Sequence, residues 1–401
     1  MLSINLNDIT LSLLASTLIL SIAVLALALP PLRRVARRCR RDDAVDIDAP
    51  MTVPSDEHYP EVSVIVHARS DSSILATLLP MLLQQVYPAE YEVIVVNDGG
   101  DDMVTDVVSR LEMDYRNLYM TFAPARSRNL SRKKLAITLG VKAARYDTVA
   151  IVAGNCLLTS PMWLKRMMRH IAAGKQIVTG YGYIVPSENA PVERRRLMAF
   201  DTVRTSVEYL ASALSGHLYR AYGDNVAYSR ELFFANKGFS GSLNYRYGDD
   251  DIFISSIATA DNYAVELSGE SMVQVVEDSP ARMHRLDKLR HNFTGRFVSH
   301  AARRRWGAVS LMWWCWTASS VAAVVTGLPS LVPLIAVTVV SLATCLPLML
   351  AWRRTSTALN SRRLCLTVPF FFWVYPLYTL CYRVMGRRHH TSNFTWSKDI
   401  A

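Results

Sequence analysis

Four long apolar segments stand out in the pattern of hydrophobic and polar positions along the chain. No charged residue interrupts positions 9–29 near the start, or positions 307–327, 328–352 and 364–382 near the end. About 20 apolar residues suffice to cross a bilayer as a helix. We therefore predict a transmembrane helix over 9–29 and a C-terminal membrane region over 307–385 with two to three transmembrane helices. The last segment contains Pro369 and Pro376, and it either spans the membrane or lies partly in its interface.

The charges around the first apolar segment predict its direction. No Lys or Arg precedes this segment, and six arginines follow it: Arg33, Arg34, Arg37, Arg38, Arg40 and Arg41. A secretory signal would carry its positive charge on the N-terminal side, so the pattern favours an anchor that is not cleaved. Because basic flanks remain in the cytoplasm, we expect an integral protein of the inner (cytoplasmic) membrane, with residues from 33 onward on the cytoplasmic side.

Between the apolar segments, strand and helix patterns alternate. Short β-branched runs at 62–66, 92–96, 148–152 and 176–180 predict strands, while positions 74–83 and 102–111 indicate helices. This alternation predicts an α/β domain over 42–292 built of parallel βαβ units. Ligands bind beyond the carboxyl ends of such strands, so Asp98 and Asn155 are expected on one rim of the sheet. Residues 293–306, with Phe293 and Phe297 one turn apart, are predicted to form an interfacial amphipathic helix.

Composition narrows the class of protein further. The formal net charge is +10, but much of this charge lies at the borders of the apolar segments, where basic residues contact lipid headgroups. We therefore expect membrane lipid, and no nucleic acid, as a partner. The six cysteines show no CxxC spacing, and four of them lie in the apolar segments. Their spacing gives no support to a zinc site or a disulfide framework and fits reduced thiols in a cytoplasmic enzyme.

A series of short motifs follows one order along the chain. They are Ser63-Val64-Ile65-Val66, Gln85-Val86-Tyr87-Pro88, Tyr91-Glu92-Val93-Ile94-Val95-Val96-Asn97-Asp98, Arg132-Lys133-Lys134-Leu135-Ala136-Ile137-Thr138-Leu139-Gly140, Gly223-Asp224-Asn225-Val226-Ala227-Tyr228, Lys237-Gly238-Phe239 and Gly248-Asp249-Asp250-Asp251-Ile252-Phe253. In this order and spacing they resemble the membrane-bound family 2 glycosyltransferases. The resemblance covers roughly residues 60 to 300. It implies a GT-A fold, a Rossmann-like domain with a mostly parallel sheet, here flanked by transmembrane helices.

The resemblance implies a donor site at the end of the second strand. Asp98 is expected to contact the base and ribose, since a carboxylate accepts hydrogen bonds from an imide N–H or a ribose hydroxyl. Its alternative is an ordinary Asn-Asp-Gly-Gly turn. Lys133 matches the family lysine and is expected to neutralise the donor pyrophosphate, with a solvated helix face as the alternative. Arg69 is also expected to bind the nucleotide.

Arg290 completes the nucleotide-binding set. It lies in Asp287-Lys288-Leu289-Arg290-His291, which is laid against the Gln-x-x-Arg-Trp motif of the processive members. A guanidinium binds phosphate through paired hydrogen bonds. Asp287 and His291 replace the family Gln and Trp, which weakens the case for a processive polymerase.

The expected metal turn departs from the family pattern. Family members have Asp-x-Asp, whose carboxylates hold Mg²⁺ or Mn²⁺ against the diphosphate, and divalent cations of this kind prefer charged oxygen ligands. Here the corresponding residues are Ala153 and Asn155. Asn155 is left as a weak, neutral ligand. Either the substrate holds most of the cation, or Lys and Arg side chains replace it, or the enzyme has lost activity.

The acidic run at 249–251 is expected to supply the catalytic base. Laid against the family motif, Asp249 takes the proton of the acceptor hydroxyl, and Asp250 is its competitor. Asp251 is expected to cap the helix that starts at Ile252 and, with Asn225, to lie on the acceptor side. Three adjacent carboxylates are otherwise often a solvated turn.

These motifs imply an inverting glycosyltransferase, a hexosyltransferase or N-acetylhexosaminyltransferase. It would transfer sugar from a nucleotide-sugar, expected to be a UDP-sugar, to a lipid-linked or envelope glycan acceptor at the cytoplasmic membrane face, a role in polysaccharide biosynthesis. The altered metal turn keeps open a second hypothesis, a catalytically silent relative that binds nucleotide or glycan and supports a partner.

Overall fold

A computed structural model describes residues 7–47, 59–69, 72–124, 131–185, 191–245, 247–277, 279–297 and 301–388. The chain divides into two compact units. The first comprises residues 1–37, 190–211 and 299–383, and the second comprises residues 38–189, 212–298 and 384–401.

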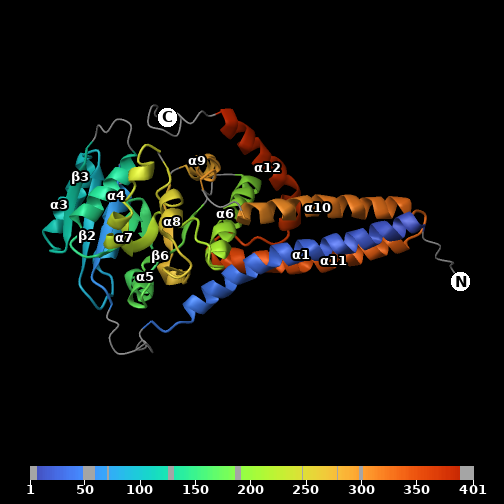
Figure 1. The fold of residues 1–401 in the computed structure, drawn as a ribbon, viewed down its shortest axis with the longest axis horizontal. Helices are drawn as coiled ribbons and strands as arrows, with labels where there is room; N and C mark the ends of the chain where they lie inside the picture. Colours follow the sequence, from blue (N-terminus) through green and yellow to red (C-terminus); the bar gives the residue numbers. More distant parts are fainter. Residues whose placement is uncertain are drawn as a thin grey trace. The chain divides into compact units, whose positions relative to one another are not determined.

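A seven-stranded sheet forms the centre of the second unit (Figure 1), in the order β3-β2-β1-β4-β8-β6-β9. Its strands are β1 (Val62–Ala68), β2 (Tyr91–Asp98), β3 (Leu118–Ala123), β4 (Thr148–Ala153), β6 (Ile177–Thr179), β8 (Asn225–Ser229) and β9 (Tyr263–Val265). The first four are parallel neighbours, whereas β8 runs antiparallel to both β4 and β6. β1, β2 and β4 are almost entirely buried, as expected for apolar strands of a parallel sheet that is covered on both faces.

Helices and a small second sheet complete this unit. The helices are α2 (Ser72–Leu83), α3 (Asp102–Glu112), α4 (Arg132–Ala143), α5 (Trp163–Ala172), α7 (Arg230–Ala235), α8 (Ile252–Ile257) and α9 (Pro280–Thr294). The small sheet has the order β5-β10-β7, from β5 (Cys156–Leu158), β10 (Val273–Val275) and β7 (Gly182–Ile184). Five leucines of α2 at three- and four-residue spacing are buried in the core, because this spacing places them on one helix face.

The predicted α/β class with a mostly parallel sheet is confirmed. The strands expected at 62–66, 92–96 and 148–152 lie within β1, β2 and β4, and the one expected at 176–180 contains β6. The helices expected at 74–83 and 102–111 lie within α2 and α3. The antiparallel strand β8, inserted between β4 and β6, was not anticipated by the simple βαβ alternation.

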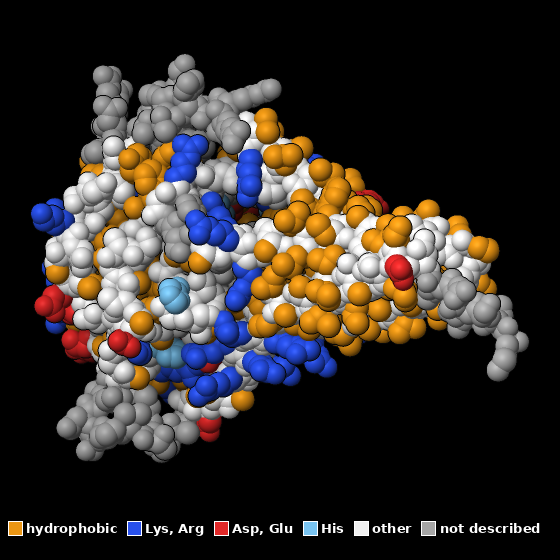
Figure 2. Space-filling model, turned by 45° about the vertical axis from the view of Figure 1, so that its right-hand side comes forward, with side chains coloured by type: hydrophobic (Ala, Val, Ile, Leu, Met, Phe, Trp, Pro, Cys, Tyr) orange, Lys and Arg blue, Asp and Glu red, His pale blue; other side chains and the backbone are white. Residues whose placement is uncertain are grey.

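The first unit is helical. It contains α6 (Val192–Ala213), α10 (Ala301–Thr326), α11 (Val332–Ala358), α12 (Val368–Arg388) and most of α1 (Asp8–Asp43), which continues into the second unit. Among the described residues, three helices are long and apolar enough to cross a membrane: Asp8–Asp43, Arg303–Thr326 and Val332–Ala358. Figure 2 shows hydrophobic side chains gathered on the surface of the long helices, and large apolar residues such as Ile19, Val321 and Ile335 are exposed there. A broad exposed apolar surface of this kind suits contact with lipid.

One predicted segment differs from the structure. The helix expected over 293–306 is not one helix: Phe293 lies in the last turn of α9, residues 295–297 form a turn and Trp306 lies in α10, while residues 298–300 lie outside the described part of the chain. The last apolar segment, for which spanning the membrane and lying in its interface were both open, forms α12 from Val368; this helix is not among the three candidate spans of the described residues. Its residues pack on α6 and α11: the Phe372 ring centroid lies 5.7 Å from that of Phe200 and 6.2 Å from that of Trp352. The Tyr375 hydroxyl donates to Asp201 of α6 at 2.7 Å.

Candidate active site

The ends of β1, β2 and β4 form one rim of the sheet. In register, His67 of β1 lies opposite Val96 of β2 and Ala153 of β4. Asp98 is the last residue of β2, and the Gly154 N–H donates to the His67 carbonyl at 2.8 Å. The turn containing Asn155 therefore lies beside the strand that faces Asp98. This is the common rim that the strand pattern predicted.

Asp98 is held at this rim by two basic side chains. Arg132 donates from Nε to Asp98 Oδ1 and from Nη2 to the Asp98 carbonyl, both at 2.9 Å. His67 Nε2 lies 3.1 Å from Asp98 Oδ2. Burial alone would raise the pKa of Asp98, but the hydrogen bond from His67 and the charge of Arg132 outweigh it and lower this pKa. The buried carboxylate is therefore kept ionised.

In the turn after β2, residues other than Asp98 make the local hydrogen bonds and cap the next helix. Asn97 exchanges hydrogen bonds with the backbone of Asp101, and the Asp101 side chain caps α3 by accepting from the Met103 N–H. Gly99 has φ +111°, and a Cβ there would lie 2.5 Å from Arg132 Nη2. The Asn-Asp-Gly-Gly turn is thus present, and its neighbours make the turn contacts. Asp98 itself faces the two basic side chains.

Three consecutive basic residues at the start of α4 contact three different sets of partners. Ser131 caps the helix, and Arg132 reaches Asp98. Lys133 turns away from Asp98 and lies 2.8 Å from both Asp224 and Asp249. Lys134 is buried and donates to Ser242 and to the carbonyls of Tyr245 and Tyr247, and burial lowers its pKa to about 8. Successive helical residues point about 100° apart, so one helix terminus serves three sites.

Lys133 opens a second cluster, which contains the expected base. Asp249 and Asp250 are both buried, and Arg290 of α9 contacts Asp250. Gly223 packs against this pair: a Cβ there would lie 2.9 Å from the Asp250 Cβ and 3.1 Å from Asp249 Oδ2. The backbone needs a glycine at this close approach. The acidic run is therefore not the solvated turn that was its alternative.

The two carboxylates differ in their proton affinity. Burial raises the pKa of Asp249, but the charges of Lys133 and Arg290 outweigh this effect and hold it well below its usual range. For Asp250, burial dominates; Arg290 opposes it, the neighbouring carboxylates add to it, and the pKa is raised to about 7. Asp250 Oδ1 is buried and has no hydrogen-bond partner within the described part of the chain. One carboxylate is therefore a fixed anion, and the other can take up or release a proton near neutral pH.

Three further residues were expected at the site: Asp251, Arg69 and Asn225. Asp251 caps α8 as predicted, accepting from the Ile252 N–H at 2.8 Å, with Arg220 3.8 Å from its other oxygen. Arg69 is exposed, directly after β1. Asn225, expected on the acceptor side, is fully buried, and its side-chain amide bonds to Trp163 and to the carbonyls of Tyr181 and Ser271. These hydrogen bonds hold the Asn225 side chain in a fixed direction between α5 and β8.

The metal turn offers a poor set of ligands. Ala153 has no oxygen in its side chain, and Asn155 is neutral, with its Nδ2 3.4 Å from the Val276 carbonyl. Among the described residues, no group of three or more His, Cys, Asp or Glu side chains is arranged to hold a metal ion. The residues present therefore do not fit a divalent cation held by protein carboxylates.

Sequence reasoning missed three residues of these clusters. His67 directly follows the run predicted as the first strand, so its strand-end position was a usable signal. Arg132 precedes the Lys pair of its motif, and Asp224 precedes Asn225 in another. Which neighbour in each motif carries the contact became visible only with the side-chain directions.

Part of this chain is similar in sequence to known proteins. Residues 63–234 match Glycosyl transferase family 2. Chondroitin synthase of Escherichia coli is 27% identical over 118 residues, which are 29% of this chain and 16% of that synthase, so the match spans only a small part of its length.

Solved structures of two further proteins resemble this chain. The mannosyltransferase PcManGT from Pyrobaculum calidifontis, in complex with GDP-Man and Mn²⁺, has a TM-score of 0.50 and 19% identity, over 86% of this chain and 96% of that one. TarS from S. aureus has a TM-score of 0.39 and 13% identity, over 82% of this chain and 54% of that one. The fold is thus of the GT-A type. Residues 63–234, less than half of the chain, are the part that matches the family 2 glycosyltransferases.

Proposed function

We propose that the chain is a membrane-anchored, inverting glycosyltransferase that uses a nucleotide-sugar, with a UDP-sugar as the first candidate. One observation supports this proposal most directly: Arg132 and Lys133, consecutive residues of α4, contact Asp98 and Asp249 at 2.9 and 2.8 Å. A carboxylate suited to a nucleoside and a carboxylate pair suited to base catalysis therefore share one helix terminus. The acceptor is a glycan or lipid-linked glycan at the cytoplasmic face of the inner membrane.

Asp98 is suited to hold the nucleoside of the donor. A carboxylate has about four lone-pair sites, so Asp98 can accept a further hydrogen bond from a base N–H or a ribose hydroxyl while Arg132 and His67 stay in place. The two basic partners keep it ionised and fix its direction. A preoriented acceptor loses little conformational entropy on binding.

The transfer step needs a base for the acceptor hydroxyl. As the acceptor oxygen bonds to the anomeric carbon, its proton passes to a carboxylate, and the bond between that carbon and the diphosphate breaks on the opposite face, with inversion. The motif assigns this role to Asp249, whereas proton affinity favours Asp250, because a base works best when its pKa is near the operating pH. Both stay in the proposal.

Cationic side chains are suited to balance the leaving diphosphate. Lys133 and Arg290 border the carboxylate pair from α4 and α9. A divalent cation, when bound, would neutralise the same charge, but Ala153 and Asn155 do not fit one well. Arginine and lysine donors match phosphate oxygens by charge and hydrogen bonding.

The same Ala153 and Asn155 turn favours a second candidate function. A family 2 domain that lacks both carboxylates of this turn can retain nucleotide or glycan binding after losing turnover. Such a silent protein would support a partner rather than transfer sugar. Binding without turnover distinguishes it from the enzyme.

The test measures release of nucleoside diphosphate by the full chain. Donors are several UDP-sugars and GDP-mannose, and acceptors are an envelope-lipid extract and short glycan oligomers. Variants are Asp249→Asn, Asp250→Asn and the matched control Asp106→Asn, an exposed carboxylate of α3. Loss of the base is expected to lower turnover roughly 10²- to 10⁴-fold, with the control unchanged. Turnover that survives both site variants would refute the base assignment, and nucleotide binding without turnover in wild type would favour the silent protein.

A further inference from the structure

A cavity of about 840 Å³ lies in the second unit, apart from the candidate active site. It borders β9, the edge strand at the opposite end of the seven-stranded sheet from β3, and it shares no lining residue with the two clusters described above. Its walls come from the end of α1, from α5 and from the segments around β9. Nothing in the proposed transfer reaction uses it.

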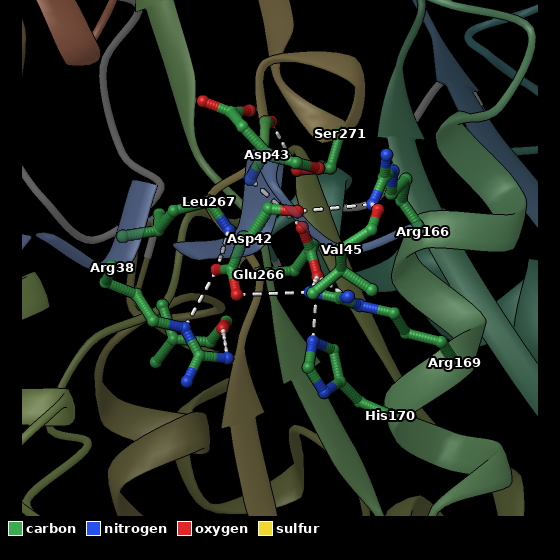
Figure 3. Close-up of polar contacts among 12 residues, drawn as sticks. Arg38, Asp42, Asp43, Val45, Arg166, Arg169, His170, Glu266, Leu267 and Ser271 are labelled. Atoms are coloured by element: carbon green, nitrogen blue, oxygen red, sulfur yellow. Dashed lines mark hydrogen bonds and ion pairs between the residues drawn. The ribbon is translucent and has the colours of Figure 1, made fainter. Parts of the chain in front are cut away.

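A buried ionic network shapes one wall of this cavity (Figure 3). Arg169 donates to Glu266 at 2.7 Å and lies 3.1 Å from Asp42, and His170 Nε2 lies 2.8 Å from Glu266. Arg38 donates to the other oxygen of Asp42 at 2.8 Å. Asp42 and Glu266 are both buried, so these basic side chains are held in fixed directions. A cationic wall of this kind is organised before any ligand arrives.

The lining keeps an excess of positive charge. Four permanent cations line the cavity, Arg38, Arg41, Arg169 and Lys175, and His170 lies with them. The carboxylates that face them are Asp42 and Asp46, with Glu266 behind the wall. Arg41 is exposed, and the Lys175 ammonium donates to a backbone carbonyl, that of Asp261, at 2.6 Å. These two cations are therefore the ones best able to turn toward an anion.

The remaining lining is apolar. It consists of small aliphatic side chains and two aromatic rings: Val45, Ile47, Ala173, Ala213, Leu214, Ala260, Ala264, Val265, Tyr59 and Tyr263. The Tyr263 hydroxyl is satisfied by the Ala213 carbonyl at 2.6 Å, so that ring presents its apolar part. A ligand that uses both walls needs an anionic group joined to an apolar group.

We propose that this cavity binds the phosphate headgroup of an anionic membrane phospholipid, with Arg41 and Lys175 as its mobile contacts and Arg38 and Arg169 as its fixed wall. Two of these arginines belong to α1, and their position in that helix favours a lipid over a soluble phosphate as the ligand. Arg38 and Arg41 lie in the last turns of the same helix whose earlier residues form a candidate span. Basic residues beside a span attract anionic headgroups, and guanidinium groups bind phosphate in pairs. The cavity adds a defined place for one headgroup.

The experiment titrates the full chain, purified in an uncharged detergent, with dioctanoyl phosphatidylglycerol and follows binding by calorimetry. Dioctanoyl phosphatidylcholine tests the charge of the headgroup, and glycerol 3-phosphate tests phosphate without acyl chains. The variant is Arg41→Gln/Lys175→Gln. Its matched control is Arg110→Gln/Lys142→Gln, which removes two exposed cations of α3 and α4 away from the cavity. We expect phosphatidylglycerol to bind best, and the cavity variant to bind it at least roughly tenfold more weakly while the control binds as wild type.

Several outcomes would overturn the proposal. Equal affinity of wild type and the cavity variant for phosphatidylglycerol would show that Arg41 and Lys175 do not contact the lipid. If the two lipids bind equally well, the negative charge of the headgroup is not what the cavity recognises. If glycerol 3-phosphate binds as tightly as phosphatidylglycerol, the ligand is a soluble phosphate. If the double variant melts early, the single variants Arg41→Gln and Lys175→Gln carry the same comparison. Sugar transfer is not measured, so failure here is separate from failure of the proposed function.

Discussion

Replacing Lys133 with methionine should destabilise the second unit and disturb the two candidate catalytic carboxylates. The change keeps most of the side-chain volume and removes an ammonium that lies 2.8 Å from both Asp224 and Asp249. Breaking a buried ion pair costs roughly 3–5 kcal/mol, because the remaining charge is left buried. The Asp249 side chain is only 5% exposed, but those of Lys133 and Asp224 are 24% and 22% exposed. We therefore expect about 3 kcal/mol, at the lower end of that range.

Thermal unfolding measures this loss. For a unit of this size, about 3 kcal/mol corresponds to a melting temperature lower by roughly 6–12 °C. Lys133 holds the pKa of Asp249 below its unfolded value, so this stabilisation is present at pH 7 and is lost as the pH falls below about 4. The control is Lys142→Met, which removes an exposed cation from the last turn of the same helix. Equal melting temperatures for the two variants at pH 7 would refute the reasoning.

Three further predictions concern the rim and the base. Asp98→Ala should abolish UDP binding in a folded protein, since it removes the ionised acceptor; unchanged affinity by calorimetry would exclude Asp98 from the site. If Asp250 is the base, kcat/KM should rise with pH up to about 7 and then level off, because a base must be deprotonated; a profile flat from pH 5 to 9 would instead favour Asp249, whose pKa is far lower. Ala153→Asp combined with Asn155→Asp should tighten Mn²⁺ binding in a calorimetric titration, since charged oxygens replace a methyl and an amide; unaltered Mn²⁺ affinity would contradict this interpretation of the turn.

The sequence predicted the strand ends of the rim well, for a physical reason. β1, β2 and β4 are continuous apolar runs buried on both faces, so each shows directly where it ends and polar residues begin. Asp98 and Asn155 could therefore be placed on one edge without coordinates. The C-terminal end of the first helix was harder to predict. The apolar run ends at Leu29, but α1 continues through Pro30 and Pro31 to Asp43, because Leu32, Ala36 and the six arginines that follow are themselves good helix formers.

Side-chain direction within a motif could not be predicted from its letters. Asn225 and Asp224 are neighbours in one motif, yet Asp224 contacts Lys133 and the Asn225 amide is enclosed by Trp163 and backbone carbonyls. Asp224 lies in the turn before β8 and Asn225 is the first residue of that strand, so the two side chains leave the backbone in different directions. A motif match places the pair in the fold without saying which member faces the site. The antiparallel pairing of β8 adds a second unknown, since the βαβ pattern predicts parallel neighbours.

The start of α4 shows how little sequence is needed to link two sites. Arg132 fixes the carboxylate at the end of β2, Lys133 fixes Asp249, and Lys134 gathers the carbonyls of the loop that leads into the acidic run. The separation between the nucleoside carboxylate and the candidate base is therefore set by the rigid first turn of one helix. The long connections of the chain contribute little to it. Placement of catalytic groups tolerates errors of only a fraction of an ångström, and a helix turn meets this requirement better than a loop does. The three adjacent cations should for this reason be far less interchangeable than their shared charge suggests.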